Sequence, residues 1–379
     1  MRHCLCFMVL LCVNWNLGFA QDVKNNFFLD FAVRNGTFVT NFTDDNFINS
    51  KVYGVDLRFG KQTFGRKEWE QWHLFPAYGL LLRYGKFDNP RLDQKLAWLV
   101  FINGKIVGKK WFSLKYEFAS GLVFWFNRYH PEKNPDNNYI GSVVNCHINL
   151  SISANFVISR SLDLIVRGSF SHSSNGVLKM PNLGVNMISG DLALRYYIKK
   201  RAEQIFTKDV ENRFSTVNTL LFYYAPGVCK SRKLFDGKYS SQLYYTSTLQ
   251  IAYYRQPHPV YRFGGGLDFM FNEEIINRLP EEKKRYGNCF SVGAFASIEL
   301  IYDRLLLSLE VGTYPYRAHN FADMVYERFG FKFMVDKKKN LFFGIALKAH
   351  AARAESIEWI VGYQFFNWKD KKHRQNKTY

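Results

Sequence analysis

The feature that most limits how this chain can fold is a two-residue hydrophobic period that recurs through most of its length. Between residues 289 and 302, for example, Phe290 and Val292 alternate with Ser291 and Gly293. Successive side chains of a β-strand point to opposite faces, so this pattern predicts strands with one apolar face and one small or polar face. No run of 18 or more apolar residues follows residue 20, which excludes helical membrane spans.

The alternating segments have about the length that a tilted membrane-spanning strand needs. Aromatic residues make up 18% of the chain, and a membrane barrel can place them in girdles at the two lipid interfaces. We therefore predict an all-β fold, a transmembrane antiparallel up-and-down β-barrel over residues 51–366 with about 12–16 strands, 14 being favoured. The expected strands are 76–86, 95–106, 111–126, 141–157, 160–174, 184–199, 215–226, 243–256, 260–272, 289–302, 304–314, 327–336, 340–350 and 356–366, with 27–34 and 51–60 left open.

The connections between these strands alternate in length, and this alternation predicts their orientation. Short connections are expected in the periplasm and long ones at the cell surface. The short ones lie near 159–163, 256–259, 303 and 335–340, and the long ones near 226–241, 272–288 and 314–327. One connection, Lys199 to Ser215, breaks the pattern because it is long but falls on the periplasmic side.

The two ends of the chain indicate its location. Residues 1–20 combine Arg2, a short apolar run and small residues before Gln21, which predicts a cleaved secretory signal peptide. We assign 21–50 to a periplasmic N-terminal extension and 367–379 to a basic, solvated tail. The segment 356–366 resembles the aromatic-ended C-terminal strand that the outer-membrane assembly machinery reads. We therefore expect this machinery as a partner and the bacterial outer membrane as the location.

The charge of the chain favours a polyanionic partner. The formal net charge is +19, and it becomes +18 without residues 1–20, which hold Arg2 and no acid. Such basicity fits nucleic acid or the phosphorylated glycolipid of the outer leaflet, and composition alone does not separate the two. For an envelope protein the glycolipid is the nearer polyanion, so we expect no nucleic-acid partner.

The cysteines and other metal-binding residue types predict neither a disulfide framework nor a metal site. Three cysteines lie outside the signal, namely Cys146, Cys229 and Cys289. An odd number allows a Cys229–Cys289 bridge, although free thiols are the default interpretation. Their spacing fits no metal site, and we expect no cofactor.

The stretch from Ser169 to Asn186 holds the residues that point to chemistry. Strand parity places His172 and Ser174 on the lipid-facing side of one strand, and Asn186 on the same side of the next. A hairpin centred near Lys179 would put His172 opposite Asn186, at roughly 5 Å. The sequence thus predicts a nucleophile, a base and an orienting group on one face.

These residue types suit ester hydrolysis. A serine hydroxyl attacks an ester when a neighbouring imidazole takes its proton, and a third group fixes the tautomer of that imidazole. Here Ser174 would attack, His172 would be the base and Asn186 would orient it. Asn175 and backbone N–H groups freed by Gly176 could donate to the oxyanion. On the membrane face, such a site would receive its substrate laterally from the leaflet.

This stretch resembles the PagL-type lipid A 3-O-deacylases, an acyloxyacyl hydrolase family of outer-membrane barrels. The family has His-x-Ser-Asn followed at fixed spacing by Pro-Asn-x-Gly, and the matching residues are His172, Ser174, Asn175, Pro181, Asn182 and Gly184. The resemblance implies a serine esterase that removes an ester-linked 3-hydroxyacyl chain from lipid A, with Pro181, Asn182 and Gly184 in substrate binding and lipopolysaccharide as partner. The acid of the family falls on Asn186, and Gly176 follows Asn175 one residue early.

A second hypothesis is a non-catalytic barrel, either a porin-like channel or a structural outer-membrane protein that retains the hairpin. Serine, asparagine and glycine are ordinary residues at a hairpin tip. Asn186 favours this alternative, because an amide cannot carry the charge that stabilises an imidazolium ion.

Overall fold

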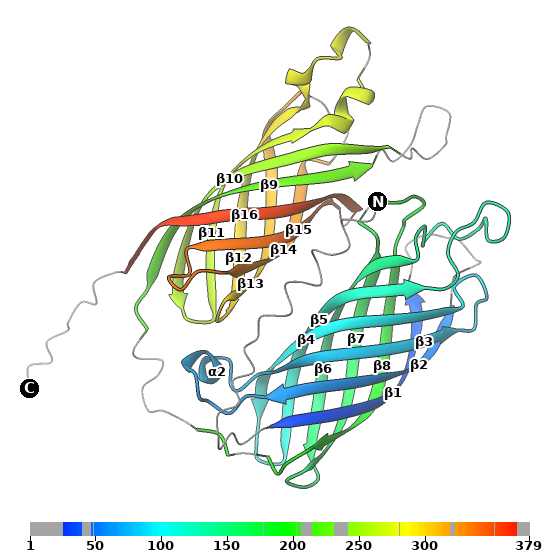
Figure 1. The fold of residues 1–379 in the computed structure, drawn as a ribbon, viewed down its shortest axis with the longest axis vertical. Helices are drawn as coiled ribbons and strands as arrows, with labels where there is room; N and C mark the ends of the chain where they lie inside the picture. Colours follow the sequence, from blue (N-terminus) through cyan, green and yellow to red (C-terminus); the bar gives the residue numbers. More distant parts are fainter. Residues whose placement is uncertain are drawn as a thin grey trace, which may run out of the picture.

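The computed structural model of this chain contains two closed antiparallel β-barrels, each of eight strands (Figure 1). It describes residues 26–39, 47, 49–176, 178–201, 203–205, 214–230, 242–279, 281–318, 323–351 and 353–369. Within each barrel every strand pairs with its neighbour in the chain, and the first strand pairs with the last. The fold class is therefore the predicted all-β, up-and-down barrel.

The first barrel closes when β1 pairs with β8 from Phe28 opposite Tyr197 to Val39 opposite Asn186. Its strands are β1 (Phe27–Val39), β2 (Lys51–Gln62), β3 (Ala77–Phe87), β4 (Gln94–Gly108), β5 (Phe112–Trp125), β6 (Val144–Val157), β7 (Leu162–Ser174) and β8 (Val185–Tyr197). The short helix α2 (Glu68–Trp72) lies in the connection between β2 and β3.

The second barrel closes when β9 pairs with β16. Its strands are β9 (Val217–Lys230), β10 (Leu243–His258), β11 (Tyr261–Asn272), β12 (Phe290–Tyr302), β13 (Leu305–Arg317), β14 (Val325–Met334), β15 (Leu341–His350) and β16 (Arg353–Lys369). Three 3-10 helices follow β11, namely η3 (Glu273–Asn277), η4 (Glu281–Lys283) and η5 (Tyr286–Cys289).

The prediction of one barrel over 51–366, with 14 strands favoured, is wrong in its closure. The described part of the chain has sixteen strands, and the segments 27–34 and 51–60 lie in β1 and β2. Residues 27–39 therefore belong to the first barrel instead of an N-terminal extension, and β16 continues to Lys369. The predicted signal peptide and residues 370–379 lie outside the described residues.

The long connection after β8 explains the break in the predicted loop pattern. It joins the last strand of the first barrel to the first strand of the second, between Tyr197 and Val217. The predicted short turns near 159–163, 256–259, 303 and 335–340 do lie between paired strands. Below, the end of each barrel that carries these turns is called the short-turn end, and the opposite end is called the long-loop end.

The alternation of side chains follows the predicted parity. Outward side chains such as Leu80, Trp98 and Leu192 are exposed and apolar. Inward side chains include fully buried arginines, such as Arg58 and Arg328, that pair with buried acids. An eight-stranded barrel is just wide enough for side chains to fill, so the lumens form polar cores.

The two barrels contact each other along their sides. At the short-turn end the hydroxyls of Tyr116 on β5 and Tyr302 on β12 are 2.8 Å apart. His73, which follows α2, donates from Nε2 to the backbone oxygen of Ile301 at 2.6 Å. Further along β5, the ring of Phe118 packs 5.8 Å from that of Phe329 on β14. The outward faces of β5 and β14 thus form an aromatic seam between the barrels.

No helix among the described residues is long and apolar enough to cross a membrane.

The three described cysteines, Cys146, Cys229 and Cys289, are all free thiols. The bridge between Cys229 and Cys289 that the sequence left open is therefore not formed.

Candidate active site

His172 and Asn186 form the predicted cross-strand pair on the outer surface of the first barrel. The two residues are directly opposite each other in the register of β7 and β8. The imidazole Nδ1 lies 2.7 Å from the amide Oδ1 of Asn186, which fits an Nδ1–H donor and a carbonyl acceptor. This bond fixes the tautomer that leaves Nε2 of His172 unprotonated and able to accept a proton.

Ser174 is the last residue of β7 and lies on the same face as His172, two residues further along. Its side chain is 6% exposed. Among the described residues no hydrogen bond joins its hydroxyl to His172. The structure therefore places the hydroxyl and the imidazole on one face without a hydrogen bond between them. In many enzymes, catalytic hydrogen bonds shorten and align only when substrate binds.

Asn175 stabilises the loop between β7 and β8, a task that differs from the predicted oxyanion contact. Its Nδ2 donates to the backbone oxygen of Lys179 at 2.6 Å and to Oγ of Ser142 at 2.9 Å, and its Oδ1 accepts from the Lys179 N–H. Both amide hydrogens are used. Its backbone N–H donates to Oδ1 of Asn182 at 3.1 Å, so the predicted residue Asn182 also holds the loop.

Gly176 is the remaining predicted oxyanion group. It is buried and has a φ of 60°, in the left-handed region that favours glycine. No hydrogen bond from its backbone N–H is found among the described residues. This N–H follows Ser174 by two residues and can still serve as a donor to a ligand.

Gly184 lies against the imidazole of His172. A Cβ atom at this position would be 2.6 Å from Cε1 of His172 and 3.2 Å from Nε2, and the φ of Gly184 is 78°. The absence of a side chain therefore makes room for the ring. Pro181 is buried in the same loop, and its backbone oxygen lies near Gly141. Of the predicted residues of the motif, Gly184 thus contacts His172, whereas Pro181 contacts Gly141.

A second serine–histidine pair lies inside the barrel and was not predicted. Oγ of Ser173 is 2.7 Å from Nδ1 of His147 on β6. Both residues point into the lumen and are almost completely buried, so a lipid cannot reach them. Nε2 of His147 lies 3.3 Å from Nη1 of Arg83, which joins this pair to the ionic core.

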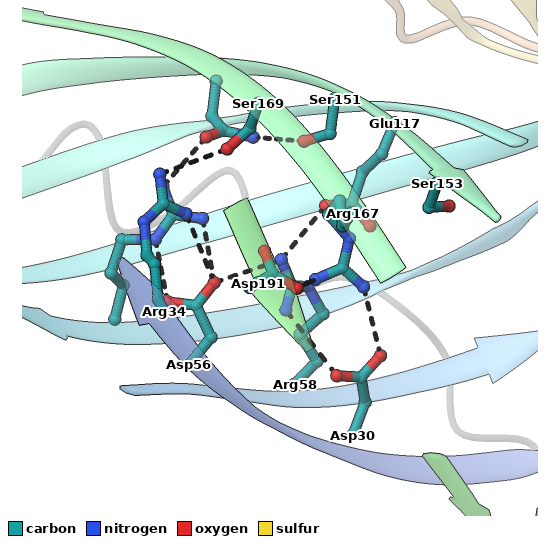
Figure 2. Close-up of polar contacts among 12 residues, drawn as sticks. Asp30, Arg34, Asp56, Arg58, Glu117, Ser151, Ser153, Arg167, Ser169 and Asp191 are labelled. Carbon is teal, nitrogen blue, oxygen red and sulfur yellow. Dashed lines mark hydrogen bonds and ion pairs between the residues drawn. The ribbon is translucent and has the colours of Figure 1, made fainter. Parts of the chain in front are cut away.

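The ionic core of the first barrel lies in its lumen, on the inner face of β7 and β8 (Figure 2). Arg167 on β7 pairs with Asp191 on β8 at 2.7 Å and with Asp30 on β1 at 3.4 Å. Arg58 on β2 lies 3.2 Å from Asp56 and also contacts Asp30. These ion pairs across the barrel were not predicted. They fix the strands that carry His172 and Asn186.

No group of three or more histidine, cysteine, aspartate or glutamate side chains that could hold a metal ion occurs in the described part of the chain. The arrangement on the outer face offers a hydroxyl, a base with a fixed tautomer and a backbone donor. Such a set is suited to acyl transfer.

Comparisons with known proteins assign the two barrels separately. Residues 53–195 match the family model described as "Lipid A 3-O-deacylase (PagL)", and residues 217–368 match "Acyloxyacyl hydrolase, C-terminal domain". The first match runs from β2 to β8 and the second from β9 to β16. A search of curated proteins gave no match.

The solved structures that match are distant. "Crystal structure of the outer membrane enzyme PagL" is 17% identical over 45% of this chain and 99% of that chain, with a TM-score of 0.30. A BenF-like porin from Pseudomonas fluorescens Pf-5 is 10% identical over 92% of this chain and 99% of that chain, with a TM-score of 0.22. The assignment rests on the two family models, which together cover most of the sequence. The chain belongs to the PagL family of outer-membrane lipid A deacylases and carries the C-terminal domain of acyloxyacyl hydrolases as its second barrel.

Proposed function

We propose that this outer-membrane lipid A deacylase cleaves its ester on the outward face of β7 and β8, with Ser174 as nucleophile, His172 as base and Asn186 as the group that orients His172. The observation that carries the proposal is the 2.7 Å contact between His172 Nδ1 and Asn186 Oδ1. It holds the imidazole with Nε2 available on the face that Ser174 shares. The ester would be that of a 3-hydroxyacyl chain of lipid A in the outer leaflet.

In the first half of the reaction, Oγ of Ser174 attacks the ester carbonyl and its proton passes to Nε2 of His172. The negative charge develops on the carbonyl oxygen, where the backbone N–H of Gly176 donates to it. When the tetrahedral intermediate collapses, His172 returns the proton to the leaving sugar oxygen. The acyl group remains on Ser174, and the sugar hydroxyl is released.

In the second half, water attacks the acyl-enzyme. Its proton passes to His172, the oxyanion forms at the same position, and the free fatty acid leaves as Ser174 regains its proton. Asn186 is neutral, so it fixes the orientation of the ring but gives little electrostatic stabilisation to the imidazolium ion. We therefore expect a slower enzyme than one with an acid at this position.

The channel alternative is less compatible with the fold. Eight-stranded barrels have room for side chains, whereas barrels of 16 to 18 strands leave an aqueous channel. In the first barrel this room holds the ionic core around Arg58, and in the second it holds the pairs of Arg328 with Asp268 and Glu310. Both barrels are therefore scaffolds with polar cores.

The test is mass spectrometry of lipid A from cells that express the wild type or Ser174→Ala. We expect loss of one hydroxyacyl chain with the wild type and a decrease in rate of about 10³-fold or more with the variant. Ser173→Ala is the matched control, because its hydroxyl points into the lumen. Activity that survives Ser174→Ala but not Ser173→Ala would overturn the assignment.

A further inference from the structure

The long-loop end of the second barrel contains a cavity of about 290 Å³. Its walls come from β9–β13, β15 and β16, and residues of η3 also line it. The helices η3 and η5 are held in place by a small apolar cluster of Ile275, Leu279 and Cys289. The cavity is just below the roughly 300–1,000 Å³ of most ligand pockets, so its size suits a small ligand such as one sugar phosphate unit.

The lining of this cavity is polar and carries more bases than acids. It includes the bases Lys230, Arg278, Arg317, Lys348 and Arg353 and the acids Glu274, Asp323, Glu355 and Glu358. Glu358 is also paired with Arg328, which lies deeper in the lumen, at 2.8 Å. Within the lining, Arg278 is paired with Glu274 at 2.7 Å, and Arg353 is paired with Asp323 at 3.1 Å. The excess of positive charge favours an anionic ligand.

The polar groups of the cavity are already ordered. Glu355 is held by Lys348 at 2.9 Å and by Nδ2 of Asn272 at 3.1 Å. The hydroxyl of Tyr314 lies 2.8 Å from Nε2 of His350. Thr246 is 5% exposed, and its hydroxyl has no hydrogen-bond partner within the described chain. A buried hydroxyl without a partner costs free energy, which a polar ligand in the cavity would recover.

The cavity is adjacent to the candidate active site. On β16, Ser356 and Glu358 line the cavity, whereas Ile357 between them points to the outer surface of the barrel. Ile357 is only 8% exposed, although the next outward residue, Trp359, is 47% exposed. The side chain of Ile357 packs against Gly176, where a Cβ would be 2.5 Å from its Cδ1.

The basic rim of the cavity also extends toward the β7–β8 loop. Lys230, at the end of β9, is close enough to Lys179 of that loop for their charges to repel each other. An anionic group between the two ammonium groups would relieve this repulsion. One strand of the second barrel and one loop of the first thus bring the cavity and the ester site together.

We propose that the cavity of the second barrel binds the phosphorylated sugar headgroup of the lipid whose ester is cleaved beside Gly176. This inference rests on the proposed function and explains why a deacylase barrel is joined to a second barrel. The headgroup enters from the long-loop end, and its acyl chains stay on the outer surface of the first barrel. The cavity selects the lipid by its headgroup, and Ser174 and His172 hydrolyse the ester of that lipid.

The test is isothermal titration of the full-length protein in detergent with glucose 1-phosphate. The variant Lys230→Gln/Arg353→Gln changes two side chains at the rim, where Arg353 is 64% exposed, and folding is checked by heat-modifiable gel mobility. Lys283→Gln, exposed on η4 and absent from the lining, is the control. We expect the double variant to bind about tenfold more weakly, the loss of about one charge-assisted hydrogen bond, and the control to bind like the wild type.

Kinetics with purified lipid A complete the test. The double variant is expected to raise KM about tenfold for phosphorylated lipid A with little change in kcat, and to leave KM for dephosphorylated lipid A unchanged. Equal binding by all three proteins, or inorganic phosphate bound as tightly as the sugar phosphate, would overturn the headgroup assignment. Titration of Ser174→Ala separates the two proposals, because this variant should bind the probe normally even if Ser174 is not the nucleophile.

Discussion

Replacing Gly184 by alanine should inactivate the enzyme, because the added methyl group displaces the imidazole of His172. The added Cβ would lie 2.6 Å from Cε1 of His172, about 1 Å inside an ordinary contact, and 3.2 Å from the backbone oxygen of Ser173. The φ of 78° adds about 1–2 kcal/mol of strain for a residue with a side chain. The imidazole must turn away, and a displacement of about 1 Å in a catalytic group can cost about 10²-fold in rate.

The assay is the rate of fatty acid release from lipid A by purified Gly184→Ala in detergent micelles. Gly168→Ala is the matched control, since it lies on β7 and an added Cβ would meet nothing within 4 Å. We expect kcat to fall about 100-fold for Gly184→Ala and to stay within about twofold for the control. Both variants should keep their heat-modifiable gel mobility. A Gly184→Ala enzyme with wild-type kcat would refute the assignment of His172 as base.

Three further predictions concern the orienting residue, the ionic core and the contact between the barrels. Asn186→Asp should raise kcat about tenfold or more at neutral pH, because a carboxylate stabilises the imidazolium ion, and a slower enzyme would contradict the role of Asn186. Arg58→Met should lower the free energy of unfolding in urea by about 3–5 kcal/mol, because it removes the arginine that pairs with buried Glu117 and that also contacts Asp56. The pair of Arg91 with Asp136 is exposed, so Arg91→Met should cost less than about 1 kcal/mol. Burial lowers the pKa of His73 to about 4, and it outweighs the hydrogen bond to Ile301, which favours the charged ring. The stability that comes from burying the neutral ring is therefore complete above about pH 6.5 and is lost as the pH falls toward 4. Thermal unfolding between pH 7 and 5 should show this loss in the wild type and not in His73→Phe.

The local part of the site could be predicted from the sequence because it depends on two neighbouring strands. The alternation of side chains along each strand predicted that His172, Ser174 and Asn186 face outward. The position of the hairpin centre predicted that His172 pairs with Asn186. Both inferences need only the two-residue period and the length of one loop. The roles of these residues in catalysis remain predictions.

The closure of the barrels could not be predicted in the same way. A strand at the end of one barrel and a strand inside a larger barrel show the same alternation, so the pairings of β1 with β8 and of β9 with β16 leave no local pattern. The long connection after Tyr197 was the one sign of a boundary. The hydrogen bond from Asn175 to Ser142 could not be predicted either, because Ser142 lies in another loop, 33 residues earlier in the sequence.

The division into two barrels has a consequence for function. Sixteen strands in one barrel would enclose a water-filled channel, whereas two barrels of eight enclose side chains. The arginines and acids that would line a channel here neutralise one another, as Arg328 does with Asp268, Glu310 and Glu358. Rigid cores of this kind hold outward side chains in fixed positions, which a surface site such as that of His172 requires. The same division creates a side-by-side contact in which Ile357 of one barrel reaches Gly176 of the other, so a second barrel can add substrate recognition without altering the strands that carry the chemistry.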